Sequence, residues 1–244
     1  MHTLGIDLAA EPKGTALARI HWSANSAQLV ELKLGVNDSE IVELAQGATK
    51  IGIDCALGWP TQFVEFLKLH SDLNLRSKPS GDINWRRDVS YRETDRFLQR
   101  LTGRWPLSVA TDRLGMTALR CAGLQARLVE AGFSRDRSGL AEMVEVYPGA
   151  TLRYWGINTA GYRFDEEIRK KLLSQLLERA PWLELGDFED NLLSSTDAFD
   201  SLIAALSARA AAISKATLPT TTDLINARVE GWIALPTVQV EELV

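Results

Sequence analysis

Cysteine is scarce in this sequence: Cys55 and Cys121 are the two cysteines among 244 residues. Two cysteines are too few for a disulfide framework or a cysteine-rich zinc site, and such low usage is typical of a reducing compartment. The first residues also lack the basic segment and the apolar segment that together make a secretion signal. We therefore expect a cytoplasmic protein.

Long hydrophobic runs are absent as well. No run approaches the ~20 apolar residues that a membrane-spanning helix needs, and the most apolar stretch, residues 202–213, contains Arg209. Hydrophobic residues make up 45% of the chain and charged residues 24%, with only 17 glycines and 8 prolines. This composition excludes a disordered or collagen-like chain. We expect a packed protein with no membrane partner.

Several catalytic motifs are also missing. The sequence has neither a G-x-x-x-x-G-K-[ST] phosphate loop nor a G-x-G-x-x-G motif after a strand. It has no G-x-S-x-G turn of the kind that carries a nucleophilic serine. The three histidines, at positions 2, 21 and 70, show no metal-ligand spacing. These absences argue against the commonest nucleotide-binding, serine-hydrolase and histidine-ligated metal sites.

Alternation of apolar and polar residues predicts an α/β fold with a mixed five-stranded sheet. Three strands come first, and their order favours antiparallel hairpins. Asn37, with Glu40 three residues later, resembles the cap of a short helix that precedes the fourth strand. A fifth strand ends before Pro148-Gly149. The predicted strands cover residues 3–9, 16–22, 29–34, 50–56 and 142–147.

Helical spacing follows between and after the last strands. Pro60 suits the start of a helix that would bury Phe63, Val64, Phe66 and Leu67. Residues 71–90 are polar and irregular, which indicates an exposed loop or lid. Further helices are predicted over residues 91–101, 114–131 and 165–179, and from Ser195-Thr196 through the alanine tract. We expect one domain, residues 1–244, with insertions near residues 71–112 and 156–193.

Two strands end in the same three residues, Gly5-Ile6-Asp7 and Gly52-Ile53-Asp54. A carboxylate at the end of a core strand is costly to bury unless it is paired or binds a metal. If the two strands are parallel neighbours, Asp7 and Asp54 lie side by side, and a bound cation would offset their repulsion. Ligation by oxygen alone favours Mg²⁺ or Mn²⁺ over zinc.

Asp197 and Asp200 are three residues apart at the start of the last long helix and therefore share one face. Ala204 and Ala208 continue this stripe, so the helix can lie close to the sheet and bring its carboxylates to the strand ends. Acidic residues in a first helical turn also complement the helix dipole, which is the simpler explanation for either aspartate alone. The conjunction with Asp7 and Asp54 favours a metal site.

The order of these elements resembles the ribonuclease-H-like superfamily, in particular its Holliday-junction resolvase branch. Six motifs along nearly the whole chain also resemble the family catalogued as domain of unknown function 429, described as predicted nucleases of ribonuclease-H-like fold. The motifs are Gly5-Ile6-Asp7-Leu8-Ala9, residues 51–60, residues 91–96, Glu145-Val146-Tyr147-Pro148, Asp197-Ala198-Phe199-Asp200 and Glu230-Gly231-Trp232-Ile233.

The resemblance implies a ribonuclease-H-like sheet and a metal-dependent nuclease. Asp7, Asp54, Asp197 and Asp200 match the acids of the resolvase pattern, although the resolvases have a glutamate at the position of Asp54. Two Mg²⁺ or Mn²⁺ ions about 3.5–4 Å apart are then expected to activate water and stabilise the leaving oxygen of a phosphodiester. Glu145 is either a fifth acid of this site or an outward residue paired with Arg153.

Residues 91–96 contain the candidate substrate-binding residues Tyr91, Arg92 and Arg96. Guanidinium groups suit phosphate oxygens, and a tyrosine ring can stack on a base. The alternative is a solvated helix face with local ion pairs, or packed aromatic rings. Glu230 can reach the site from the C-terminal segment, but the sequence alone favours a surface position.

The net charge of −5 conceals an uneven distribution. Residues 76–120 contain ten Lys or Arg and five Asp or Glu, so the rest of the chain is acidic. We expect a nuclease that hydrolyses a nucleic acid with two metal ions, in which the basic segment meets phosphates. Two alternatives are a noncatalytic nucleic-acid or protein-binding module of the same fold and a nucleotide-phosphate enzyme related to actin and the sugar kinases.

Overall fold

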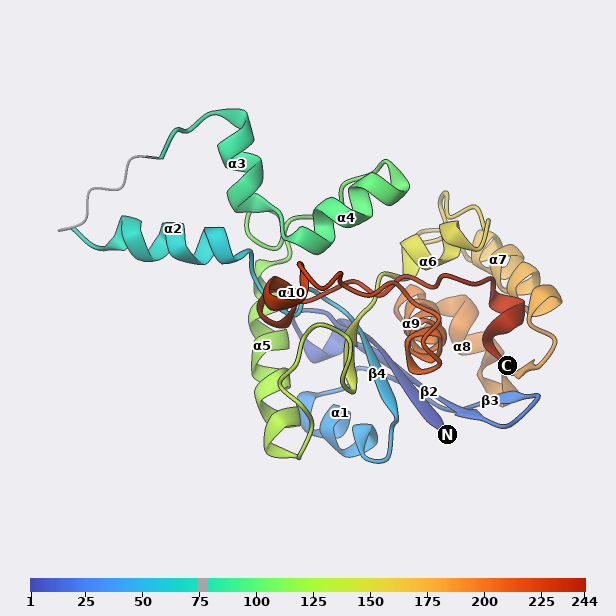
Figure 1. Cartoon of the computed structure of the whole chain (residues 1–244). Helices are drawn as coiled ribbons and strands as arrows, with labels where there is room; N and C mark the ends of the chain where they lie inside the picture. Colours follow the sequence, from blue (N-terminus) through green and yellow to red (C-terminus); the bar gives the residue numbers. More distant parts are fainter. Residues whose placement is uncertain (74–78) are drawn as a thin grey trace.

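The computed structural model describes residues 1–73 and 79–244 as a mixed α/β structure, in which helices flank a six-stranded sheet (Figure 1). The strand order is β5-β4-β1-β2-β3-β6. The strands are β1 (His2–Asp7), β2 (Ala16–Trp22), β3 (Ala27–Leu34), β4 (Lys50–Asp54), β5 (Met143–Glu145) and β6 (Leu183–Glu184).

The sheet begins as predicted, with β1, β2 and β3 in an antiparallel arrangement. β4 then pairs parallel to β1, and β5 pairs parallel to β4. The predicted count of five strands is corrected to six, because β6 pairs parallel to the outer edge of β3. β6 is only two residues long, which is too short for a period-2 pattern to show in the sequence.

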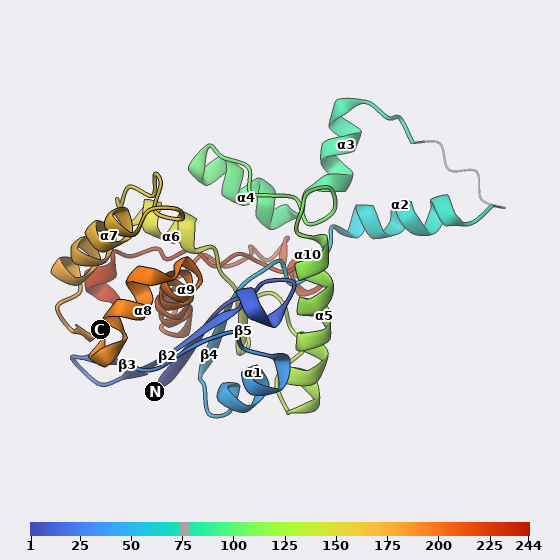
Figure 2. The same ribbon diagram turned by 180° about the vertical axis from the view of Figure 1, so that it is seen from behind.

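Helices cover both faces of the sheet, as the two opposite views show (Figures 1 and 2). On one face, Leu4 and Ile6 pack with Leu124 of α5 and with α1. On the other face, Ile20 and Trp22 pack with α9, α7 and α8. These helices are α1 (Asp38–Ala45), α5 (Gly115–Glu130), α6 (Pro148–Tyr154), α7 (Glu166–Arg179), α8 (Glu189–Ser194) and α9 (Thr196–Ala212).

The α9 helix lies unusually close to β1 and β4 because glycines face it. A β-carbon on Gly5 would lie 2.1 Å from the backbone nitrogen of Ala205, and one on Gly52 would lie 2.6 Å from the carbonyl oxygen of Ala204. Ala208 also contacts the Gly52 position. The prediction that small residues let this helix approach the sheet is confirmed.

Three helices, within residues 61–71 and 83–102, extend away from the sheet in both views (Figures 1 and 2). They are α2 (Thr61–Ser71), α3 (Ile83–Ser90) and α4 (Glu93–Thr102). The expected burial of Phe63, Val64, Phe66 and Leu67 is wrong: α2 lies wholly within the described residues, and none of its side chains is buried. Part of the expected irregular loop is helical, because Asp82 caps the start of α3.

The remaining helix, α10 (Leu224–Glu230), packs against α2 and α4. Two positions of the predicted basic segment, Arg76 and Lys78, lie outside the described residues. Within residues 1–73 and 79–244, no helix is both long enough and apolar enough to cross a membrane.

Candidate metal centre

Parallel pairing of β1 and β4 places two aspartates next to each other at the end of both strands. The register pairs Gly5 with Gly52 and Asp7 with Asp54. Both aspartates are partly buried, whereas the isoleucines before them point into the core. Because the two Gly-Ile-Asp sequences are paired in register, their two carboxylates lie side by side at the same edge of the sheet.

The α9 helix adds a third carboxylate. Asp200 lies one helical turn before Ala204, the residue that touches Gly52, and its side chain is buried. Carboxylate oxygens of Asp7, Asp54 and Asp200 all lie within 4.8 Å of one another. Three oxygens at this spacing could hold a metal ion, and the donor type suits Mg²⁺ or Mn²⁺.

Asp197, three residues before Asp200 on α9, stands beside this triad, and its charge contributes to the raised pKa of Asp7. Asp197 lines a cavity that opens over the triad, but it is not one of the three residues whose oxygens cluster together. Of the four predicted metal ligands, the structure thus brings three into one cluster and places the fourth at its side.

The charges of the triad are poorly compensated in the metal-free protein. Burial, together with repulsion from the neighbouring Asp200, raises the pKa of Asp54 to about 8. Burial likewise raises the pKa of Asp7 well above its usual value, with repulsion from Asp54 and Asp200 adding to the effect. The pKa of Asp200 rises to about 6, again mainly through burial. A divalent cation would replace the missing positive charge.

Asp200 is held by two neighbours that the sequence analysis did not single out. The Tyr162 hydroxyl donates to Asp200 Oδ1 at 2.9 Å, and Arg163 Nη2 lies 3.8 Å from Asp200 Oδ2. Both residues belong to the loop between α6 and α7, which was expected to be part of an insertion. Only its position beside α9 reveals the role of this loop.

Arg169 fixes that loop to the start of α9. This buried guanidinium donates to the carbonyl oxygens of Tyr162 and Leu193, each at 2.8 Å, and to Thr196 Oγ1 at 3.1 Å. The loop and the helix that carries Asp200 are therefore positioned together. These hydrogen bonds therefore help to fix the position of the Asp200 carboxylate.

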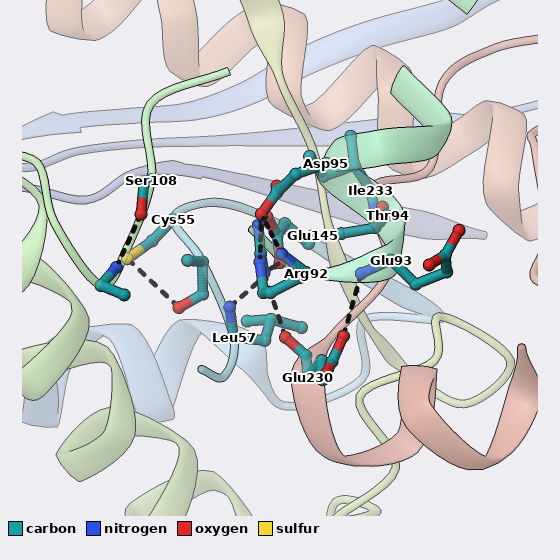
Figure 3. A network of polar contacts seen from close by, with 12 residues as sticks. Cys55, Leu57, Arg92, Glu93, Thr94, Asp95, Ser108, Glu145, Glu230 and Ile233 are labelled. Atoms are coloured by element: carbon teal, nitrogen blue, oxygen red, sulfur yellow. Dashed lines mark hydrogen bonds and ion pairs between the residues drawn. The ribbon is translucent and has the colours of Figure 1, made fainter. Parts of the chain in front are cut away.

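The structure places Glu145 and Arg92 in a buried ion network (Figure 3), and both residues also line the cavity over the aspartates. Both oxygens of Glu145 accept hydrogen bonds of 2.7 Å from Arg92, and Leu57 N donates a further bond of 3.0 Å. Asp95 accepts two more hydrogen bonds from Arg92, at 2.9 and 3.1 Å. With a bond to the Glu230 carbonyl oxygen, all five N–H groups of Arg92 are engaged.

Glu230 is buried, so its expected surface position is wrong. Its Oε1 accepts from the Thr61 backbone N–H at 2.7 Å, and its Oε2 accepts from the Glu93 backbone N–H at 3.0 Å (Figure 3). One carboxylate therefore caps the starts of both α2 and α4, where unpaired N–H groups and the helix dipole favour an anion.

The other two predicted substrate-binding residues lie outside the cavity wall. Arg96 donates to the Asp88 carbonyl oxygen at 2.9 Å and so caps the end of α3, and it pairs with the carboxylates of Asp88 and Glu93. Tyr91 packs against Trp105, with ring centroids 4.2 Å apart. Their predicted roles in substrate binding stay predictions.

A cavity of about 470 Å³ opens above the carboxylates. Its wall includes the triad, Asp197, Arg163 and the exposed Arg113. Arg113 has no hydrogen-bond or carboxylate partner among the described residues. The cavity thus combines a carboxylate floor with three arginines, of which Arg92 is engaged in the buried ion network.

These features define a class: a mixed α/β protein with a carboxylate cluster where two parallel strands and a helix meet at the sheet edge. The family described as "Protein of unknown function (DUF429)" matches residues 5–223, and the chain belongs to this family. The match includes every carboxylate of the cavity. No curated protein and no solved structure matches the chain.

Proposed function

We propose that the protein is a metal-dependent nuclease that hydrolyses phosphodiester bonds of a nucleic acid. The observation that carries the proposal is the cluster of Asp7, Asp54 and Asp200 at the base of an open cavity. The sheet order, with three antiparallel strands followed by two parallel ones and an acidic helix packed on top, supports a ribonuclease-H-like fold. No protein nucleophile is needed for this reaction.

The carboxylates fit Mg²⁺ or Mn²⁺ because they are hard oxygen donors, and among the described residues Arg163 is the one cation that pairs with the triad. Asp7, Asp54 and Asp200 would hold one ion, and Asp197 with Asp7 offers ligands for a second. Such ions supply Lewis-acid activation of water and stabilisation of the leaving oxygen.

The side chains around the cluster have separate tasks in this proposal. Tyr162 and Arg169 hold Asp200 and its loop in place, as their hydrogen bonds indicate. Arg113 and Arg163 provide positive charge at the cavity wall, where guanidinium groups can bind phosphate oxygens. Arg92 and Glu145 are part of the cavity wall and hold each other in place through two hydrogen bonds.

Cleavage assays test the proposal directly. The protein is incubated with Mg²⁺ or Mn²⁺ and branched DNA, an RNA–DNA hybrid or single-stranded nucleic acid. We expect cleavage of at least one substrate and a loss of about 100-fold or more in the Asp7→Asn variant, since a ligand of the reaction's metal ions is removed. Asp187→Asn, which changes an exposed aspartate outside the cavity, is the matched control.

Cleavage by Asp7→Asn at the wild-type rate would overturn the assignment. A crystal soaked in Mn²⁺ provides an independent measurement, with anomalous peaks expected between Asp7, Asp54 and Asp200. A soaked crystal without a peak at these carboxylates would also contradict it.

A further inference from the structure

A second cavity, of about 240 Å³, adjoins the carboxylate cavity. Tyr147 and Arg163 line both cavities, so the two spaces share a wall. The other side chains that matter here are Arg153 and Phe164. No carboxylate lines this second cavity among the described residues, whereas five acidic residues line the first one.

Arg153 is the first reason to assign a ligand to this space. Its guanidinium lies over the Tyr147 ring, 5.6 Å from the centroid. A β-carbon at Gly149 would lie 3.4 Å from Arg153 Nη1, an ordinary contact distance, so the guanidinium folds back along α6 toward Gly149. Stacking of this kind orients an arginine without using its N–H groups.

The N–H groups of Arg153 have no protein acceptor among the described residues. Glu145, which the sequence offered as a partner for Arg153, instead binds Arg92 through both of its oxygens. Arg153 therefore retains its full hydrogen-bonding capacity at the cavity wall. An anion with several oxygens is the ligand class that such a group binds best.

Arg163 supplies a second positive charge between the two cavities. Its guanidinium is half exposed and lies near both Asp200 and the Tyr162 hydroxyl. Consider an anionic polymer with one negatively charged group over the carboxylates. Its next charged group would lie near Arg163 and the following one near Arg153. This order fits a polymer with regularly repeated negative charges.

Phe164 is the third element, because its side chain is 94% exposed at the edge of the second cavity. A fully exposed phenylalanine beside two arginines resembles the stacking platforms that hold bases of single-stranded nucleic acids. Arg153 lies on α6, and Arg163 and Phe164 lie in the loop between α6 and α7. All three side chains line the second cavity and therefore form one surface.

We propose that Arg153, Arg163 and Phe164 form a subsite for the nucleotide next to the bond that is cleaved. The arginines bind its backbone phosphate, and Phe164 stacks on its base. The subsite rests on the proposed nuclease function and extends it, because it specifies on which side of the carboxylate triad the nucleic-acid strand continues.

Binding of a fluorescent single-stranded oligonucleotide of roughly eight nucleotides, without divalent metal, tests the subsite. Arg153→Ala should raise the Kd roughly tenfold, the loss expected for a charged hydrogen bond. The slope of log K against log salt should fall by about 0.7, which corresponds to one phosphate contact. Arg153→Lys should keep the slope, and Phe164→Ala should raise the Kd without changing the slope.

Arg135→Ala is the matched control, because Arg135 is exposed and lines neither cavity. An Arg153→Ala variant that binds like this control would overturn the subsite, as would a wild-type protein that does not bind the oligonucleotide. Hydrolysis of bis(p-nitrophenyl) phosphate, which is too small to reach both cavities, separates the two proposals. We expect Arg153→Ala to leave this rate unchanged; an equal loss in both assays would contradict the subsite. If the wild-type protein cleaves none of the nucleic acids of the cleavage assay but Arg153→Ala still weakens oligonucleotide binding, the nuclease assignment fails and the three residues remain a binding surface for single-stranded nucleic acid.

Discussion

Arg92 has five N–H groups, and the structure gives each of them an acceptor within the protein. Asp95 and Glu145 neutralise its charge, so the three side chains form a compact buried unit. A guanidinium in this state contributes to packing and positioning. The arginines with spare capacity, Arg113 and Arg153, are exposed or half-buried instead.

Replacing Arg92 tests this distinction. Arg92→Met should lower the free energy of unfolding by about 3–5 kcal/mol, because it leaves Asp95 and Glu145 buried without their counter-charge. Arg100→Met, which removes an exposed partner of Glu93, should change it by at most about 1 kcal/mol. Urea unfolding measures both. A stable Arg92→Met variant with weakened substrate binding would instead favour a direct phosphate contact.

Asp54 offers a second test at the scale of one residue. Because burial and repulsion from Asp200 raise its pKa to about 8, Asp54→Asn should stabilise the metal-free protein at high pH. We expect a gain of at least about 1 kcal/mol, the free energy of one pKa unit. The same variant should lose the stabilisation that Mn²⁺ gives the wild-type protein. Thermal unfolding with and without Mn²⁺ measures both effects, and a variant that responds to Mn²⁺ like the wild type would contradict the site.

The sequence could predict the triad but not its supporting residues. Asp7, Asp54 and Asp200 follow from strand ends and helix spacing, which are local patterns. Tyr162 and Arg163 reach Asp200 only because a loop distant in sequence folds over the start of α9. No spacing rule connects positions 162 and 200, so this contact depends on tertiary structure.

At the scale of elements, the approach of α9 to the sheet decides where Asp200 lies. Gly5→Ala would place a methyl group 2.1 Å from backbone atoms of α9, so the helix must move or the strand must bend. Overpacking of this kind costs typically about 1–3 kcal/mol and sometimes more. We expect a lower melting temperature and weaker metal binding, because the displacement separates Asp200 from Asp7.

Gly123→Ala is the natural control for this substitution. Gly123 lies within α5, and a β-carbon there meets no described atom within 4 Å. Alanine should raise the free energy of unfolding by about 0.5–1 kcal/mol through its higher helix propensity. If Gly5→Ala and Gly123→Ala have the same effect, close packing of α9 is not what positions the third carboxylate.

Local patterns predicted most of the elements and failed where burial was concerned. The capping box of Asn37 and Glu40 is present, and α5, α7 and α9 lie close to their predicted bounds. The apolar side of α2 was assumed to face a core, but a helix that projects from the sheet finds none. A periodic pattern indicates that a helix has an apolar face, and only the topology determines what covers it.

At the scale of the whole molecule, the raised pKa values make stability depend on pH. The folded-state pKa is about 8 for Asp54 and about 6 for Asp200, and both lie above the usual aspartate value of 3.8. Folding therefore favours the protonated carboxyls, and this contribution is complete below about pH 4 and lost as the pH rises through 6 and 8. The metal-free protein should melt at a lower temperature near pH 9 than near pH 5.

Mg²⁺ should reverse this trend, since it binds the deprotonated carboxylates. At a concentration about 100 times its Kd, an ion that binds only the folded state adds about 2.7 kcal/mol of stability. For a chain of this size that corresponds to a rise of roughly 5–11 °C in melting temperature. Differential scanning fluorimetry at both pH values measures the shift, which should be larger near pH 9. An equal shift at the two pH values would indicate binding elsewhere.

The two outer strands of the sheet have a consequence for solubility during folding and expression. Beside β5, the segment after α10 runs parallel to the strand, and Ala234 N donates to the Glu145 carbonyl oxygen at 2.9 Å. At the opposite edge, β6 offers only two residues for pairing. Long exposed edge strands invite pairing with other chains, and β6 pairs with only Ala27 and Gln28 of the long strand β3. The β5 edge, by contrast, is covered by the same C-terminal segment that follows Glu230, so edge-to-edge pairing is hindered on that side of the sheet.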